Sequence, residues 1–233
     1  VYVVLLFFSA HVVRVACSDA NVSSKARILP SAFDSVTAEW WQWALSIPVV
    51  DNPVLDTTGD KCVVGQHGEH WFLAGIFPGV GSVVRSCTMP LGKNVVIPIA
   101  NGVNIDAPNV CGQVNESIPL TELRSQLAPI IDKVTKIGAR IDGKPVSVHR
   151  VKSVSFGVSL PDDNPLSDAC PGIGGGGYPT GVYRAVADGI YTFFRPIRPG
   201  LYSINFHAEF DPSLGFLIDV TYNLNVVPVL LRK

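Results

Sequence analysis

Two stretches near the carboxyl end decide the fold: Gly200-Leu-Tyr-Ser-Ile-Asn-Phe-His207 and Phe216-Leu-Ile-Asp-Val-Thr-Tyr-Asn-Leu-Asn-Val-Val227. Apolar and polar side chains alternate along the first stretch, and they alternate along the second from Ile218 onward. Alternation with a period of two places every second side chain on the same face of a strand. The first strand therefore carries one apolar face, formed by Tyr202, Ile204 and Phe206. We expect both stretches to be half-buried, antiparallel β-strands.

Further strand-like runs precede these two and are separated from one another by Gly, Pro and Asn turn signals. They are Trp71–Ile76, Val83–Cys87, Val95–Ile99, Val146–Val151, Val154–Leu160 and Gly189–Arg195. Helical spacing occurs in only two places, over Phe33–Ile47 and in a helix that starts at Thr121 and includes Val134. The pattern predicts a mainly β protein. We expect an antiparallel β-sandwich of jelly-roll or immunoglobulin-like type, with two inserted helices and an extended N-terminal strand.

Composition limits the class of protein. The chain has 233 residues, of which 47% are apolar and 16% are charged, and its net charge is −1. We expect an N-terminal extended segment and linker over residues 1–30 and one β-sandwich domain over 31–233. No basic patch supports nucleic-acid binding. The longest apolar run is broken by Ser9, His11 and Arg14, so it is too short to span a membrane.

That run, Val1–Cys17, is typical of the core of a secretory signal peptide, with Ser18-Asp-Ala20 as a small-residue cleavage site. If the run is retained instead, it must be buried. Exposing its six central residues to water would cost on the order of 10 kcal/mol. These residues form the predicted assembly strand: Val3, Val4, Leu5, Leu6, Phe7 and Phe8. A strand that is apolar on both faces fills either its own domain or a groove in a neighbouring copy.

Insertion into a neighbour is the function that we expect. Head-to-tail insertion does not close, so it generates a filament. We therefore expect a secreted, extracellular structural subunit whose partners are further copies of the chain and glycans, with no enzymatic activity and no cofactor. Two alternatives stay open. One is a monomeric carbohydrate-binding module that uses exposed tryptophans, and the other is a metal-assisted hydrolase.

The cysteines and two sequons fit a secreted protein. Widely spaced cysteines without a C-x-x-C motif favour disulfides over a metal site. We expect the pairs Cys62–Cys87 and Cys111–Cys170, which leave Cys17 unpaired, although some of these cysteines could instead be buried thiols. The sequons begin at Asn21 and Asn115 and would accept glycans in a eukaryotic secretory pathway.

One short cluster carries candidate catalytic chemistry. His67-Gly-Glu-His70 contains two imidazoles and a carboxylate, which could bind a metal or act as a base with an orienting acid. The spacing differs from H-E-x-x-H, and the flanking glycines favour a solvated turn. His149 and His207 lie on later strands and could approach the cluster. We therefore expect no catalytic residue and no metal site.

Three other patterns have a plain structural interpretation. Pro161-Asp-Asp-Asn164 together with Asp168 could bind Ca²⁺, but it is more typical of a turn. Gly174–Gly177 lacks the residues of a phosphate-binding loop and is typical of a surface loop. Tryptophans also cluster in one helix and one strand, and we expect at least one of the helical rings at a rim or a partner surface. They are Trp40, Trp41, Trp43 and Trp71.

Several longer words occur in a fixed order. They include Ala38-Glu-Trp-Trp-Gln-Trp-Ala-Leu-Ser-Ile-Pro48, Gly65-Gln-His-Gly-Glu-His-Trp-Phe-Leu-Ala-Gly75 and Asp219-Val-Thr-Tyr-Asn-Leu-Asn-Val-Val-Pro228. Over about residues 34–228 the chain resembles a family of secreted, signal-peptide-bearing proteins of unassigned function. The resemblance implies secretion and a single domain, and it implies no activity. In overall character the chain is also similar to glycan-coated extracellular filament subunits from environmental water samples.

Overall fold

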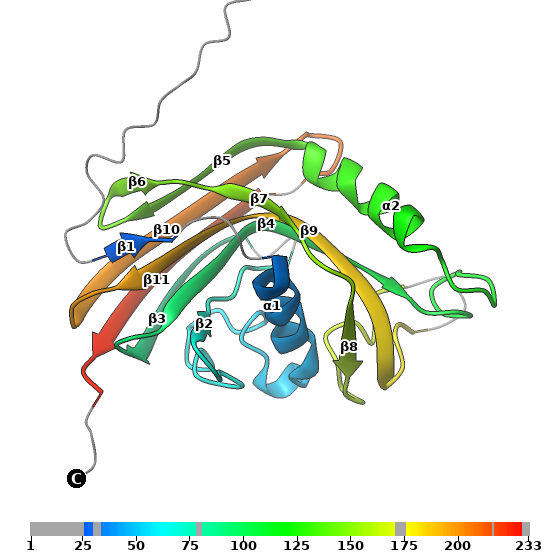
Figure 1. The fold of residues 1–233 in the computed structure, drawn as a ribbon, viewed down its shortest axis with the longest axis horizontal. Coiled ribbons are helices and arrows are strands. Elements are labelled where there is room, and N and C mark those ends of the chain that lie inside the picture. Colours follow the sequence, from blue (N-terminus) through cyan, green and yellow to red (C-terminus); the bar gives the residue numbers. More distant parts are fainter. Residues whose placement is uncertain (1–25, 30–33, 78–80, 171–175, 216, 230–233) are drawn as a thin grey trace, which may run out of the picture.

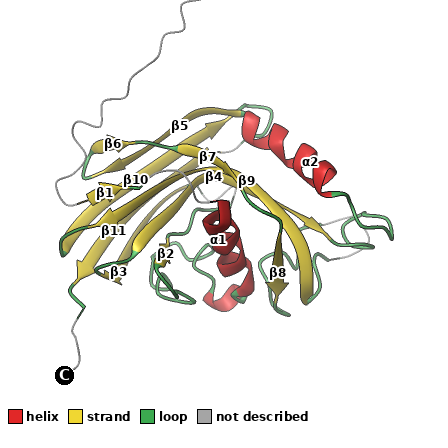
Figure 2. Ribbon diagram, viewed as in Figure 1, coloured by secondary structure: helices red, strands yellow, loops and turns green. Residues whose placement is uncertain are grey.

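The computed structural model describes residues 26–29, 34–77, 81–170, 176–215 and 217–229 (Figure 1). Within them the chain folds into two β-sheets that pack face to face, with two α-helices (Figure 2). The predicted β-sandwich with two helices is confirmed. The predicted assembly strand, Cys17 and the first sequon lie outside the described residues.

The first sheet is built around one long strand, β9, which spans Gly181–Pro196. One edge of β9 pairs with β4 (Asn94–Asp106), and β4 pairs in turn with β2 (His70–Phe72). The opposite edge pairs with three short strands, each covering a different part of β9: β8 (Phe156–Leu160), β7 (His149–Lys152) and β1 (Ala26–Ile28). Strand β1 lies within the stretch that the sequence predicted to be a linker.

The second sheet has the order β3-β11-β10-β5-β6. Its strands are β3 (Ser82–Pro90), β11 (Leu217–Val227), β10 (Gly200–Phe210), β5 (Val134–Ile141) and β6 (Lys144–Val146). The expectation of antiparallel pairing holds for most pairs, but β3 runs parallel to β11 and β2 runs parallel to β4. Both sheets are therefore mixed. Val134, which the periodicity placed in a helix, begins β5.

Apolar side chains from the facing surfaces of the two sheets form one core. The other face of the first sheet packs against helix α1 (Asp34–Ser46) and forms a second core. Helix α2 (Leu120–Asp132) packs against β4 and β9 beside the second sheet. Its Leu127 fits over Gly102, where a Cβ atom would lie 2.8 Å from the Leu127 side chain. The long strands β4 and β9 thus carry three packed elements, which are α1, α2 and the second sheet.

The helix boundaries follow from local chemistry. Asp34 places a carboxylate in the first turn of α1, where it interacts favourably with the helix dipole, and Pro48 follows the end of the helix. Helix α2 continues through Pro129. A short 3₁₀-helix, Val49–Asp51, opens the loop after α1. Neither of the described α-helices is long and apolar enough to cross a membrane.

Candidate functional site

Helix α1 presents four side chains to one side because they recur at helical spacing, three, four and seven residues apart: Glu39, Gln42, Trp43 and Ser46. They form one wall of a recess of about 300 Å³. The turn before β2 contributes Gly65 and His67, and the outward-facing positions of β8 contribute Gly157 and Ser159. We call this recess the polar cleft. Its walls bring together three segments that lie far apart in the sequence.

Hydrogen bonds hold the carboxylate and the imidazole of the polar cleft in place. The Glu39 carboxylate lies 3.2 Å from Nδ1 of His70, the first residue of β2. Nδ1 of His67 lies 2.9 Å from the carbonyl oxygen of Gly65, so it acts as the donor and leaves Nε2 without that proton in a neutral ring. The cleft therefore presents a carboxylate that already has a partner and a ring nitrogen that can accept.

Neutral side chains of the cleft are held in the same way. Nε2 of Gln42 donates to the Gly157 carbonyl at 2.8 Å and joins α1 to β8. The Ser46 hydroxyl donates to the Trp43 carbonyl at 3.3 Å, and the Trp43 indole donates to the Val64 carbonyl at 2.9 Å. Each of these groups has one fixed hydrogen bond. The Gln42 oxygen and the lone pairs of the Ser46 hydroxyl stay available to a ligand.

The candidate residues His67, Glu69 and His70 are only partly brought together. His67 lines the polar cleft, His70 contacts Glu39, and Glu69 is exposed and is not part of the lining. Glu39 was not among the residues predicted for a site, although its helical spacing from Gln42 was a usable signal. Among the described residues no group of three or more His, Cys, Asp and Glu side chains is arranged to hold a metal ion.

The two later histidines lie elsewhere. His207 is on β10 of the second sheet, where it contacts Glu209 at 3.2 Å. His149 begins β7 in the first sheet, where it pairs with Tyr191 of β9. The alternative in which His149 or His207 approaches the first cluster is not observed.

A second, apolar cavity of about 110 Å³ lies on another side of α1. Its walls come from α1, the segment after β2, β4, the end of α2 and the facing ends of β10 and β11. They include Trp41, Ile76, Asn101, Ile131, Phe210 and Ile218. Ile130 also lines it and is 44% exposed. We call this space the apolar cavity.

The edge of β4 next to β2 is free of described strands over part of its length. Beyond its pairing with β2, β4 continues to Asp106, and no described strand pairs with that part of its edge.

The expectation of an exposed tryptophan is wrong. All four rings are buried, and none is more than 7% exposed. Trp40 donates its indole N–H to the Leu73 carbonyl at 2.9 Å and packs edge-on against Trp41 at 4.9 Å between ring centroids. The segments before and after β2 cover α1. The tryptophan rings of α1 are therefore buried although they point in different directions. No tryptophan offers an open face for a sugar.

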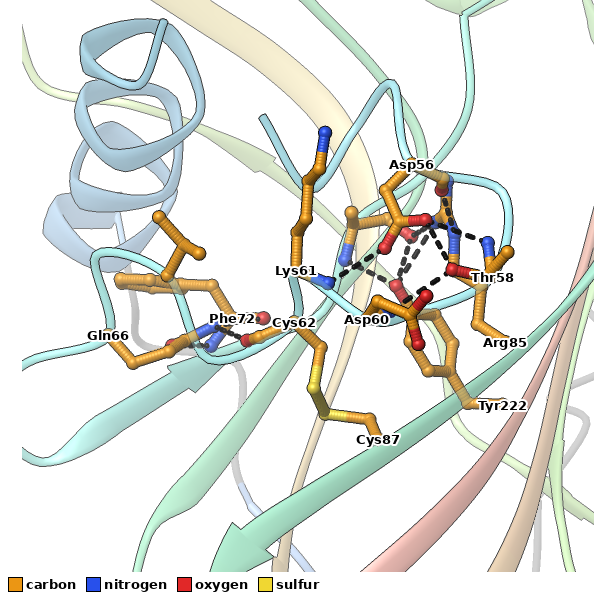
Figure 3. The surroundings of a disulfide bond; sticks show 12 residues. Asp56, Thr58, Asp60, Lys61, Cys62, Gln66, Phe72, Arg85, Cys87 and Tyr222 are labelled. Carbon is orange, nitrogen blue, oxygen red and sulfur yellow. Dashed lines mark hydrogen bonds between the residues drawn. A yellow bond between two sulfur atoms is a disulfide. The ribbon is translucent and has the colours of Figure 1, made fainter. Parts of the chain in front are cut away.

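Both predicted disulfides are present. Cys62–Cys87 ties the loop after α1 to β3 (Figure 3). Beside it the buried guanidinium of Arg85 contacts the Tyr222 hydroxyl, and the Asp56 carboxylate accepts the amides of Thr58 and Lys61. Burial alone would raise the pKa of Asp56, but these hydrogen bonds outweigh it, so the pKa is lowered.

The second disulfide, Cys111–Cys170, joins the loop after β4 to the loop after β8. The second sequon, at Asn115, lies on the exposed surface of the first of these loops, and its side chain accepts a hydrogen bond from Asn109 at 2.7 Å. An exposed loop is where a glycan can be attached, so the position is compatible with the predicted modification.

The candidate Ca²⁺ ligands lie in a turn. Asn164 is fully buried, and its side-chain amide donates to the carbonyls of Pro161 and Tyr178. Its oxygen accepts the amide of Leu166, so the side chain is used for the turn. In the Gly-rich loop, a Cβ on Gly177 would lie 2.0 Å from the carbonyl oxygen of Leu166. This close approach accounts for one of its glycines.

Comparisons of the chain with models of protein families, with curated proteins and with solved structures find no match. The resemblance to a secreted family, and the weaker likeness to filament subunits, therefore stay predictions from the sequence.

Proposed function

We propose that the protein is a secreted structural subunit that polymerises into an extracellular filament. In this proposal residues Val3–Phe8 of one copy extend a sheet of the next copy. The observation that carries the proposal is the apolar run at residues 1–17, which contains long apolar side chains on both faces of any strand it forms. Such a strand is stable only where protein covers both faces.

The position of β1 indicates that the N-terminal strand does not insert at the edge of β9. Strand β1 leads the described domain and pairs with β9 at Pro196. Strands β7 and β8 pair with the same edge of β9 farther along. A preceding strand cannot add to the paired parts of that edge. The 25 residues before β1 could reach about 80 Å when extended, which is enough to cross to a second copy.

The edge of β4 beyond β2 is the acceptor that we favour. It lies beside the apolar cavity, which takes apolar side chains from an added strand. An engineered cavity of about 150 Å³ holds one benzene ring. At about 110 Å³ the apolar cavity therefore suits one aliphatic side chain, and main-chain hydrogen bonds to β4 would hold the rest of the strand.

Deletion of residues 1–17 tests the proposal. Electron microscopy should show filaments for the full chain and separate particles for the deletion variant. Leu6→Asp should also abolish filaments, because a charge would enter an apolar site. Val114→Asp is the matched control, since Val114 is an exposed apolar residue of a loop and should tolerate the charge. Filaments that persist after the deletion would refute the proposal.

Cross-linking distinguishes insertion into a neighbour from insertion into the same chain. Leu6→Cys and Ile130→Cys are placed on two separate chains, both with Cys17→Ser, and the chains are mixed before oxidation. A disulfide between the two chains supports donation to a neighbour. If the doubly substituted single chain instead cross-links only within itself, the strand fills its own domain and the polymer proposal fails.

A further inference from the structure

We propose that the polar cleft is a binding site for one neutral sugar ring. This inference concerns a site within one copy of the chain and does not depend on filament formation. Its first basis is size. A recess of about 300 Å³ falls at the lower end of the range of small-ligand sites, roughly 300–1,000 Å³.

The second basis is the kind of groups that line the cleft. They comprise one amide, two hydroxyls, one imidazole and one carboxylate: Gln42, Ser46, Ser159, His67 and Glu39. A polyhydroxylated ring offers alternating donors and acceptors at its rim, and each of these side chains can meet one of them. Trp43 forms the apolar part of the lining without exposing a ring face.

The third basis is that several of these groups are already oriented. Glu39 is held by His70, Gln42 by the Gly157 carbonyl, and the His67 ring by the Gly65 carbonyl. A ligand that binds here immobilises few side chains, so less of its binding energy is lost to ordering the site.

One glycine is required where the turn before β2 meets the wall of the cleft. At Gly65 the backbone has φ = 67°, and a Cβ atom would lie 3.1 Å from the Trp43 ring and 3.0 Å from Ile47. A side chain at this position would press on Trp43, which lines the cleft.

Charge decides which sugars fit. The carboxylate of Glu39 disfavours an anionic ligand. The same carboxylate already has His70 as a partner, so an ammonium ligand would have to compete with that contact. No lysine or arginine belongs to the cleft lining, which contains the described residues named above. A neutral pyranose is therefore the favoured class over a uronic acid, an amino sugar or a phosphate.

Saturation-transfer NMR on the full chain tests this inference. The probes are glucose, galactose, mannose and N-acetylglucosamine, with glucuronic acid as the anionic comparison. We expect saturable transfer from at least one neutral sugar and weaker binding of glucuronic acid. No transfer from any of the four neutral sugars, or tighter binding of glucuronic acid, overturns the proposal.

Two substitutions locate the site. Ser159→Phe fills the cleft from β8 and should weaken binding at least about tenfold. Ser46→Ala removes one hydroxyl and should weaken binding by about fivefold, the effect of one neutral hydrogen bond. Ser125→Ala is the matched control, because the Ser125 hydroxyl makes the same bond to the carbonyl three residues earlier, in α2.

The control should keep the affinity of the unmodified chain within about twofold, as expected for an exposed position away from the site. Binding that survives both cleft substitutions places the sugar elsewhere and overturns the assignment. If Ser159→Phe does not fold, as judged by its thermal transition, Ser46→Ala against Ser125→Ala decides the question alone.

Discussion

Arg85 donates a hydrogen bond from Nη1 to the hydroxyl of Tyr222 at 3.0 Å, and its guanidinium carbon lies 5.6 Å from the centre of the same ring. The two residues face each other across the parallel pair β3–β11, where Arg85 and Tyr222 are in register. Arg85 is only 1% exposed. Its other hydrogen bonds go to main-chain carbonyls, those of Val54, Asp56, Ala74 and Gly75. One side chain thus anchors two loop segments to the edge of the second sheet.

The first prediction concerns this anchor. Arg85→Met should lower the free energy of unfolding by about 3 kcal/mol or more, because several buried carbonyls lose their donor at once. Tyr222→Phe should cost about 1–2 kcal/mol, since it removes one buried hydroxyl and keeps the ring. Urea unfolding followed by tryptophan fluorescence measures both. Arg140→Met is the control, because Arg140 is exposed and bonds to a single carbonyl. Equal losses for Arg85→Met and Arg140→Met would contradict the assigned role.

The second prediction ranks the two disulfides. Loop closure alone favours Cys111–Cys170, whose separation of 59 residues exceeds the 25 of Cys62–Cys87. The entropy difference between loops of these lengths is only about 0.7 kcal/mol. Both sulfurs of Cys62–Cys87 lie in the core between the sheets, and replacing them leaves a cavity that costs roughly 1 kcal/mol or more.

The double variant Cys62→Ala with Cys87→Ala should therefore be less stable than Cys111→Ala with Cys170→Ala. Calorimetric melting of the two double variants, compared at the same pH, decides the order. If the variant without Cys111–Cys170 melts at the lower temperature, the prediction is wrong, and the longer loop contributes more to stability than the burial of Cys62–Cys87.

The alternating strands were predictable because their pattern is local. Tyr202 is 1% exposed, and Ile204 and Phe206 are fully buried, as the alternation indicated. The extent of β4 was not predictable. Asn101-Gly102 is a typical turn signal, yet β4 passes through it, and the glycine instead makes room for Leu127 of α2. Packing against a helix that is distant in the sequence can require a glycine within a strand. A single sequence does not show where that helix lies.

The polar cleft was only half predictable for a similar reason. His67 drew attention because it stands in a dense cluster, but its neighbours in the cleft come from α1 and β8. Glu39 and His70 are 31 residues apart and meet only after the loop between them has wrapped α1. That loop has no periodicity that would predict its path. The same wrapping buries the helical tryptophan rings, at least one of which was predicted to lie at a rim or a partner surface.

The third prediction concerns Gly189 of β9. A Cβ atom there would lie 2.5 Å from Cβ of Asn101 and 2.9 Å from the Ala100 carbonyl, next to an irregularity in the β4–β9 pairing. Gly189→Ala should therefore destabilise the protein by about 1–3 kcal/mol through overpacking. Gly138→Ala is the matched control on β5, because nothing lies within 4 Å of its Cβ position. Chemical unfolding of both variants gives the comparison, and equal stabilities would show that β4 and β9 separate without cost.

The last prediction uses Asp106, at the end of β4, which is 6% exposed. Burial would raise its pKa, but hydrogen bonds from the Ile118 amide, Gln113 and Arg184 outweigh burial and lower it. A pKa that is lower in the folded state stabilises the fold above the unfolded pKa, and this contribution disappears as pH falls through the folded value. The native protein should therefore lose stability as the pH falls below about 4.

Asp106→Asn removes the titrating group, so its stability deficit relative to the native protein should be largest near about pH 7 and should shrink as the solution is acidified. Urea midpoints measured at a series of pH values give both curves. Asp162→Asn, on an exposed turn, is the control and should shift the midpoint little at neutral pH. A deficit for Asp106→Asn that stays constant from neutral to acidic pH would mean that the hydrogen bonds to Asp106 do not favour its charged form.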